Sequence, residues 1–257
     1  MIIDGKAVSE KRIDELLKER AQFGALTLSI VVTNEDAVTS SYLRIKSRVA
    51  ERLAIVTELL SSLADARGDG VVLQLPLPSH VDTDIERNKI PLFGDVDVLS
   101  DAAYQKFVDG DFPPPPVPRA MEYLLNEYNV PVSGKVVVVI GQGRLVGKPA
   151  AELFRQRGAL VTALQKGDDI FAHTRGADII VLGAGEPNLL KPDMIKDGVV
   201  ILDAGTSEAG GVVVGDADPR CAEKASLFTP VPRGIGPIAV VEIFANLFEL
   251  KRLQSKN

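Results

Sequence analysis

The sequence predicts a two-domain α/β protein built around largely parallel sheets. Apolar runs rich in β-branched residues alternate with amphipathic segments, and a proline-rich stretch interrupts the chain before its middle. Alternation of this kind is typical of parallel sheets whose two faces are covered by helices. The six runs that we expect to form strands are 25–33, 70–75, 135–140, 159–164, 178–182 and 198–203.

The stretch from Phe112 to Pro118 (FPPPPVP) marks the expected domain boundary. Proline cannot continue a helix interior or a central strand, and consecutive prolines form a stiff, extended chain. We therefore expect an N-terminal domain over residues 1–118 and a second domain over residues 119–238. The apolar helical pattern within 239–257 is expected to return and pack on the first domain.

The composition excludes several classes of protein. At 257 residues and 46% hydrophobic content, the chain can form two folded cores. The longest apolar runs are far shorter than the roughly 18 residues that suggest a membrane span, and the N-terminus does not resemble a secretory signal. The single cysteine, Cys221, fits a reducing compartment, so a cytoplasmic location is expected.

Charge and metal-ligand content narrow the partners further. A net charge of −6 argues against extensive contact with nucleic acid, which needs clustered cations. His80 and His173 are the only histidines, and they are far apart in sequence with no cysteine nearby. We therefore expect no metal site.

A glycine-rich turn follows the strand expected at 135–140. Gly141, Gln142 and Gly143 open the motif GQGRLVGKP, and the segment after it has helical composition. A strand, close-approach glycines and a helix N-terminus together form a phosphate-binding turn, so we predict a Rossmann-like, parallel-sheet domain that binds a dinucleotide. The spacing departs by one residue from the strict fingerprint, and further strand–helix units after it strengthen the prediction.

The choice between NAD and NADP depends on the end of the next strand. Lys166 follows the strand expected at 159–164 and can pair with a 2′-phosphate, whereas Asp168 and Asp169 just beyond it would repel that group. The sequence favours NADP slightly over NAD.

Apolar residues between the first two strands step by three or four positions from Tyr42 to Leu63, which predicts one long helix. Tyr42 and Lys46 lie one turn apart on it, so both can reach one ligand. A lysine that acts as a general base must have a lowered pKa, through burial or through neighbouring cations such as Arg44 and Arg48. From periodicity alone, an exposed lysine beside a core tyrosine remains the simpler interpretation.

Seven segments resemble, in the same order, the motifs of bifunctional methylenetetrahydrofolate dehydrogenase/cyclohydrolases. Any single segment is weak evidence, but seven in order across nearly the whole chain are specific. These segments are TNEDAVTSSYLRIKSR, VVLQLPLPSH, GDVD, IGQGRLVGKP, ADIIVLGAGEP, VVILDAG and TPVPRGIGP.

The resemblance implies oxidation of 5,10-methylenetetrahydrofolate by hydride transfer to NAD(P), followed by hydrolysis of the methenyl product to 10-formyltetrahydrofolate. Lys46 matches the family's catalytic lysine, Tyr42 the tyrosine that stacks on the substrate, Gln74 the glutamine that contacts the lysine, and Asp97 the carboxylate that holds the pterin. The remaining implied residues are Leu73 and Leu75 beside the substrate, Thr206 beside the cofactor, and the closing loop with Pro232, Gly234, Ile235, Gly236 and Pro237.

The sequence also departs from the family pattern. Gln142 and Gly143 replace the usual Arg and Ser of the cofactor turn, Val98 replaces the glycine after GDVD, and Arg233 replaces a glycine of the closing loop. The stretch between Ile55 and Gly70 is shorter than usual, and we expect it to lack a strand and part of a helix.

Other functions remain open. Short-chain dehydrogenases also use a Tyr-x-x-x-Lys pair, but their glycine-rich turn precedes the pair, which is the reverse of the order found here. The chain could be a folate dehydrogenase without cyclohydrolase activity, or a catalytically silent folate- or nucleotide-binding module. The resemblance further implies a homodimer that binds one-carbon derivatives of tetrahydrofolate.

Overall fold

The computed structural model describes residues 1–34, 37–209 and 212–255, except for the side chains of residues 37–39, 41, 42 and 209. Its contacts divide the chain into two compact units. Unit 1 contains Met1–Ser9 and Val117–Ala239, and unit 2 contains Glu10–Pro116 and Val240–Asn257. The first nine residues were expected in the N-terminal domain, but they belong to unit 1, because Ile3 N donates to Phe228 O at 2.9 Å.

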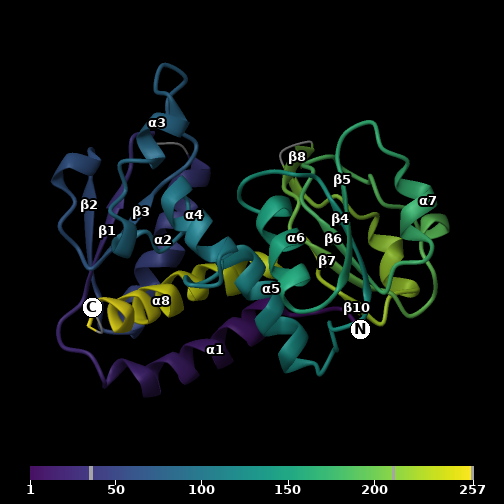
Figure 1. The fold of residues 1–257 in the computed structure, drawn as a ribbon, viewed down its shortest axis with the longest axis horizontal. Helices are drawn as coiled ribbons and strands as arrows, with labels where there is room; N and C mark the ends of the chain where they lie inside the picture. The colour runs from purple at the N-terminus through teal and green to yellow at the C-terminus, as the bar shows by residue number, and fades with distance from the viewer. Residues whose placement is uncertain (35–36, 210–211, 256–257) are drawn as a thin grey trace. The chain divides into compact units, whose positions relative to one another are not determined.

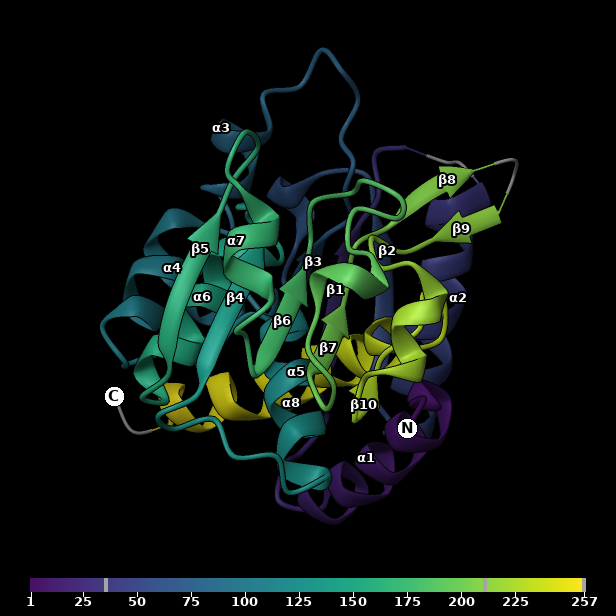
Figure 2. The same cartoon turned by 90° about the vertical axis from the view of Figure 1, so that its right-hand side faces the viewer.

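Unit 1 is built on a five-stranded parallel sheet with the order β10-β7-β6-β4-β5 (Figures 1 and 2). The chain starts this sheet at β4, adds β5 on one side and then continues with β6 on the other, so the strand order reverses between β4 and β6. A short antiparallel hairpin, β8–β9, is separate from the sheet. The strands are β4 (Val136–Ile140), β5 (Leu160–Leu164), β6 (Ile179–Leu182), β7 (Val200–Asp203), β8 (Ser207–Ala209), β9 (Val212–Val214) and β10 (Leu227–Phe228).

Alternate residues of this sheet enter two separate cores. Val137, Val139 and Val181 pack with α5 (Pro116–Glu127) and α6 (Gly147–Gln156). The residues between them in sequence belong to a second core, which includes buried side chains from the segments after β6 and β7. Because both faces are covered, the strands read as continuous apolar runs, as a buried parallel sheet requires. Helix α7 (Ile170–Thr174) and the 3₁₀ turns η3 (Pro192–Met194) and η4 (Pro219–Glu223) complete unit 1.

Unit 2 has a three-stranded parallel sheet with the order β2-β1-β3 (Figure 1). Val31, Val71 and Leu73 on one face pack against the connections that follow β2 and β3. The long helix α8 (Ile235–Gln254) begins in unit 1, and its residues from Val240 onward belong to unit 2. Helix α1 (Gly5–Arg20) likewise begins in unit 1 and belongs to unit 2 from Glu10 onward. The other elements of unit 2 are β1 (Thr27–Val31), α2 (Ala37–Arg52), β2 (Val56–Leu60), η1 (Leu63–Asp65), β3 (Gly70–Leu73), α3 (Thr83–Arg87), η2 (Leu92–Gly94) and α4 (Asp101–Val108).

The α/β fold class and the six expected strands are confirmed, but two local predictions are wrong. The helix expected to reach Leu63 ends at Arg52, because Ala54 adopts a left-handed φ of 49°. The segment after it forms the strand Val56–Leu60, so the shortened stretch keeps a strand. Only the 3₁₀ turn Leu63–Asp65 lies between that strand and β3.

The proline-rich stretch lies at the division between the units. Its last three residues form the first turn of α5, which begins at Pro116. Proline is tolerated there because the first turn of a helix has no internal partner for its N–H groups.

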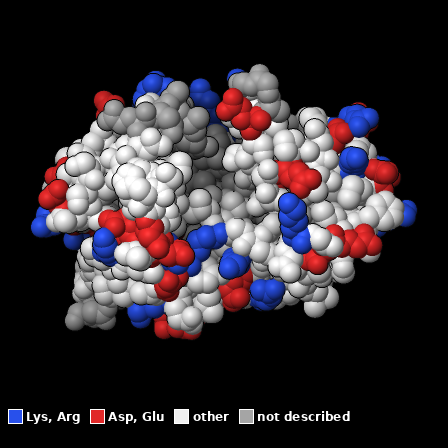
Figure 3. Space-filling model, turned by 90° about the horizontal axis from the view of Figure 1, so that it is seen from above, with Lys and Arg blue, Asp and Glu red and all other residues white. Residues whose placement is uncertain are grey.

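The surface carries both signs of charge. The face in Figure 3 shows acidic and basic side chains interspersed rather than one basic field. Among the described residues, none of the helices combines the length and apolar content needed to cross a membrane.

Candidate functional site

Lys46 occupies a core position of α2. Its side chain is 7% exposed, and Val49, Ala50 and Leu53, which follow at three-, four- and seven-residue spacing, are buried as well. Residues at these spacings share one helix face. The lysine therefore lies on the apolar stripe of the helix, where periodicity placed Ile45 instead. Ile45 is 39% exposed.

Gln74 meets Lys46 from the end of β3. Its backbone N–H donates to Val31 O at 2.9 Å, which extends the pairing of β1 and β3 by one residue and fixes where the side chain begins. Lys46 Nζ donates to Gln74 Oε1 at 2.7 Å, and Gln74 Nε2 donates to Leu75 O at 2.8 Å. Both ends of the amide are thus engaged, and its oxygen faces the lysine.

Asp97 comes from the loop between η2 and α4. The two residues on either side, Val96 and Val98, are buried, while Asp97 itself is half-buried. Asn246 of α8 donates from Nδ2 to Val96 O at 2.8 Å. Val98 has a φ of 53°, an unusual conformation for a β-branched residue, at the position where the family pattern has glycine.

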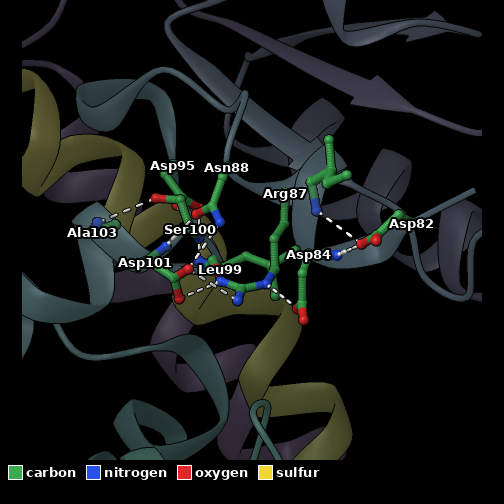
Figure 4. Close-up of polar contacts among 10 residues, drawn as sticks. Asp82, Asp84, Arg87, Asn88, Asp95, Leu99, Ser100, Asp101 and Ala103 are labelled. Atoms are coloured by element: carbon green, nitrogen blue, oxygen red, sulfur yellow. Dashed lines mark hydrogen bonds and ion pairs between the residues drawn. The ribbon is translucent and has the colours of Figure 1, made fainter.

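A polar network that includes the buried side chains of Asp95 and Arg87 holds the residues on either side of Asp97 (Figure 4). Asp95 accepts hydrogen bonds from Leu99 N at 2.9 Å and Ser100 N at 2.8 Å. Arg87 donates to Leu99 O at 3.1 Å and to Asp101 Oδ1 at 2.7 Å, which fastens the start of α4. Since paired buried groups resist movement, the network fixes the backbone that presents Asp97.

The electrostatics of the three residues suit proton transfer. Burial lowers the pKa of Lys46, and the nearby charge of Asp97 opposes that shift without cancelling it. Loss of water raises the pKa of Asp97 to about 6, with Lys46 lowering it and Asp95 raising it. The lysine is therefore neutral more often than an exposed one at the same pH. Arg44 and Arg48 are exposed, so burial is the cause rather than their charge.

The other residues expected around the substrate lie in different surroundings. Leu73 is buried in β3, and Leu75 packs partly buried against the same core. The backbone of Tyr42 lies in α2, one turn before Lys46, and its side chain is outside the described part of the structure. Pro232–Pro237 lies in unit 1, where Ile235 begins α8.

The glycine-rich turn packs its backbone closely and leaves one side open. A Cβ atom on Gly141 would lie 2.5 Å from Gly183 O, and one on Gly147 would lie 1.7 Å from Gly141 O, so both positions require glycine. Gly143 is exposed and has open space where a Cβ would point. Helix α6 begins at Gly147 with no side-chain cap among the described residues. The turn thus offers an open backbone beside a helix N-terminus.

Two further residues expected at the cofactor lie at the carboxyl edge of the same sheet. Lys166 is exposed directly after β5, where Asp168 Oδ2 accepts from Gln165 N at 2.8 Å. Thr206 is exposed after β7. The side chain of Gln142, also expected at the cofactor, folds back onto its own turn, where Nε2 donates to Gly141 O at 2.8 Å.

Sequence reasoning missed two buried carboxylates at this edge, Asp203 and Asp216. Asp216 accepts from Ala184 N at 2.7 Å and Glu186 N at 2.8 Å, and Asp203 accepts from Gly205 N at 2.9 Å. The signal in the sequence that could have pointed to them is the second glycine-rich turn, GAGEP, which follows the strand at 178–182 and supplies backbone N–H groups to Asp216. Among the described residues, no group of three or more His, Cys, Asp or Glu side chains is arranged to hold a metal ion.

Comparison with known proteins identifies the family. The family model described as tetrahydrofolate dehydrogenase/cyclohydrolase, NAD(P)-binding domain, matches residues 115–255. The "Bifunctional protein FolD" of Aliarcobacter butzleri is 33% identical over an alignment 283 positions long, gaps included, which covers 100% of this chain and 98% of that protein. The chain belongs to the tetrahydrofolate dehydrogenase/cyclohydrolase family. The resemblance of its seven motifs to this family is therefore confirmed.

Solved structures of the family share the fold. The bifunctional enzyme FolD of Campylobacter jejuni superposes with a TM-score of 0.90 at 29% identity, covering 99% of both chains. A Trypanosoma brucei methylenetetrahydrofolate dehydrogenase-cyclohydrolase, solved with NADP cofactor and inhibitor, has a TM-score of 0.89 at 28% identity and covers 100% of this chain and 99% of that one. The family architecture thus extends over the whole chain.

Proposed function

We propose that this chain oxidises 5,10-methylenetetrahydrofolate with NAD(P) and hydrolyses the methenyl product to 10-formyltetrahydrofolate, with Lys46 as the general base. The observation that carries the proposal is a buried lysine held at 2.7 Å by Gln74, beside Asp97, in a member of this family. A structural lysine would gain nothing from burial, because desolvation of an ammonium group is costly.

The hydrolysis needs a base that is neutral near pH 7. Water adds to the cationic methenyl carbon, and a proton of that water passes to Lys46 Nζ. The hydroxyl group formed on this carbon then gives up its proton as the carbon–N5 bond breaks, and N5 takes up a proton, which leaves the formyl group on N10. The pKa of Lys46 is lowered by burial, so its Nζ can accept the proton.

Gln74 and Asp97 have supporting roles in this proposal. Gln74 Oε1 accepts from Nζ at 2.7 Å and so directs the lysine toward one position. Asp97, with its pKa raised to about 6, remains ionised at neutral pH and can accept hydrogen bonds from the amino edge of the pterin. Tyr42, Leu73 and Leu75 complete the proposed substrate contacts, together with the Pro232–Pro237 loop.

The glycine-rich turn fits a dinucleotide. When bound, the dinucleotide supplies the nicotinamide ring that accepts the hydride. Gly141 and Gly147 allow the close backbone packing of the turn, Gly143 leaves its outer side open, and Thr206 lies on the neighbouring edge segment. These features support unit 1 as the dinucleotide-binding domain and unit 2 as the folate domain.

We further propose NADP as the preferred cofactor, with Lys166 pairing with its 2′-phosphate. Lys166 is exposed after β5, and the two aspartates that follow are already engaged. Asp168 accepts from Gln165 N and Asp169 from Ala172 N at 3.1 Å, so both carboxylates bind their own backbone.

The assembly and location of the enzyme are also proposals. The resemblance to the family implies a homodimer, which multi-angle light scattering would detect as twice the mass of the 27.5 kDa chain. The buried, unpaired thiol of Cys221 supports a reducing, cytoplasmic location.

The experiment that tests the proposed function follows the oxidation of methylenetetrahydrofolate by absorbance, first with NADP and then with NAD. Reduced nicotinamide without lasting methenyltetrahydrofolate is the expected result. Accumulation of methenyltetrahydrofolate would instead indicate a dehydrogenase without cyclohydrolase activity. No reduction with either cofactor would leave a silent binding module as the better account.

A further inference from the structure

Asp216 is a buried carboxylate that binds three consecutive backbone N–H groups. It is fully buried, and it accepts from Ala184 N at 2.7 Å, Gly185 N at 3.1 Å and Glu186 N at 2.8 Å. An ionised carboxylate that receives several N–H groups forms strong, charge-assisted hydrogen bonds. One side chain, 30 residues further along the chain, therefore fixes the backbone of the turn that follows β6.

That turn lies where the strand order of the sheet reverses. The reversal occurs between β4 and β6, and ligands of open parallel sheets bind outside the carboxyl ends of the strands at such a point. A Cβ on Gly141, the first glycine after β4, would lie 2.5 Å from Gly183 O and 2.7 Å from Ala184 N. The phosphate-binding turn and the turn held by Asp216 are thus in direct backbone contact.

The same carboxylate reaches a third segment of this edge. A Cβ on Gly205 would lie 2.1 Å from the Asp216 side chain, so the segment after β7 packs directly on it. Ser207 of that segment donates from Oγ to Gly185 O at 2.8 Å. The segments after β6 and β7 therefore both pack on Asp216, and the segment after β4 contacts the first of these two segments.

We propose that Asp216 is a positioning residue for dinucleotide binding. It holds the 183–186 turn in place against the phosphate-binding turn, so that the 183–186 turn forms one wall of the dinucleotide site. It acts through the backbone and does not itself contact the reacting atoms. The inference rests on the proposed dinucleotide-dependent activity of unit 1. It names a residue that sets the affinity of this unit for the dinucleotide. Hydrolysis of methenyltetrahydrofolate requires no hydride transfer, so Asp216 should matter little to it.

The test replaces Asp216 with asparagine, which keeps the shape but supplies one carbonyl oxygen where the carboxylate has two acceptors. We expect the Kd for NADP, measured by isothermal titration calorimetry, to rise by at least about tenfold, since charge-assisted hydrogen bonds to the wall are lost. The rate of methenyltetrahydrofolate hydrolysis should stay within about twofold of wild type. An unchanged Kd, or an equal loss of binding and hydrolysis, would overturn the proposal.

Two further variants keep the test decisive. Asp178→Asn is the matched control, because Asp178 also accepts from a backbone N–H, Val136 N at 2.9 Å, but at the amino edge of the same sheet. It should leave the Kd unchanged. If Asp216→Asn does not fold, Ser207→Ala removes a single exposed hydrogen bond to the same turn, and it should raise the Kd about threefold. Wild-type Kd with Ser207→Ala would then count against the proposal.

Failure of this inference differs from failure of the proposed function. Wild-type protein that neither binds NADP nor reduces it would refute the function. Wild-type protein that does both, with Asp216→Asn binding NADP equally well, would refute the role of Asp216 alone.

Discussion

Lys46 shows how one side chain is tuned by its position on a helix. It lies on the buried stripe of α2, whereas Arg44 and Arg48 on the same helix are exposed. Burial removes water from the ammonium group and lowers its pKa, while the hydrogen bond to Gln74 keeps it in place. The chemistry at this site thus depends on a lysine in a position that usually holds an apolar residue.

The sequence could place this lysine only through family resemblance. Helical periodicity assigns apolar residues to the core, and it therefore chose Ile45, which is 39% exposed, over Lys46, which is 7% exposed. Functional sites depart from the rules of packing, so pattern reasoning fails at the residues that matter most. Asp216 was missed for a related reason, because its partners are backbone N–H groups about 30 residues away in sequence.

Lys166 gives a residue-scale prediction about cofactor choice. Lys166→Ala should raise the KM for NADP about fivefold while leaving the KM for NAD unchanged, because only NADP carries a 2′-phosphate. Steady-state kinetics with both cofactors measure this. Lys135→Ala, before the amino end of β4, is the control. Equal changes for the two cofactors would exclude pairing with the phosphate.

At the scale of elements, four helices end in the same way. The second residue after each helix adopts a left-handed conformation, and paired backbone hydrogen bonds close the last turn. Ala54 after α2 has a φ of 49°, and its two bonds are Ala54 N to Glu51 O and Ile55 N to Ala50 O. The equivalent residues after α4, α5 and α6 are Gly110, Asn129 and Gly158.

This pattern explains why α2 was predicted too long. Alanine is the best helix former and gives no sign of a helix end, unlike the glycine or asparagine that terminates the other helices. The residues after it, Val56 to Leu60, also kept the apolar spacing of a helix by coincidence. The six expected strands were predictable, since each is a short apolar run of the kind that a buried parallel sheet contains, whereas the two- and three-residue strands β8, β9 and β10 were not predicted.

Ala54→Gly should stabilise the protein. A left-handed alanine costs about 1 kcal/mol relative to glycine, so the unfolding midpoint should rise by roughly 2–4 °C. Gly110→Ala, at the same position after α4 and with open space around it, should lower the midpoint by a similar amount. Calorimetry of both variants tests the pair. A lower midpoint for Ala54→Gly would show that the alanine is not strained.

At the scale of the whole molecule, contacts between distant parts of the sequence complete each unit. Residues 1–9 join unit 1 through Ile3 N to Phe228 O and Gly5 N to Arg233 O. In unit 2, the fully buried Glu242 of α8 pairs with Arg12 of α1 at 2.8 Å. The proline-rich stretch predicts a boundary after residue 118, but pairings of this kind have no local signal, so the sequence did not predict where the N-terminal residues pack.

Asp203 gives a prediction about the stability of the whole chain. Burial, with the nearby charge of Asp216, raises its pKa to about 7 from an ordinary value of 3.8. The folded state therefore binds the Asp203 proton more tightly than the unfolded state does. The stabilisation from this proton is complete below pH 3.8 and is lost as the pH rises through about 7. Over that window, the free energy of unfolding should fall by up to about 4 kcal/mol on account of this group.

Asp203→Asn removes this titration. Between pH 4.5 and 8, the variant should become more stable relative to wild type as pH rises, as measured by urea unfolding at several pH values. Asp178→Asn is the control, because hydrogen bonds from Lys196 and Val136 lower the pKa of Asp178 and place its titration below this range. Parallel pH curves for wild type and Asp203→Asn would refute the assignment.

The most direct test of the central claim is the absorbance assay of Lys46→Met with methylenetetrahydrofolate and NADP. We predict reduced nicotinamide together with lasting methenyltetrahydrofolate, because hydrolysis should fall at least about 100-fold while dinucleotide binding remains. Arg48→Met, an exposed cation two residues further along the same helix, should behave as wild type. Methenyltetrahydrofolate that disappears as fast in Lys46→Met as in wild type would contradict the claim that this lysine is the general base.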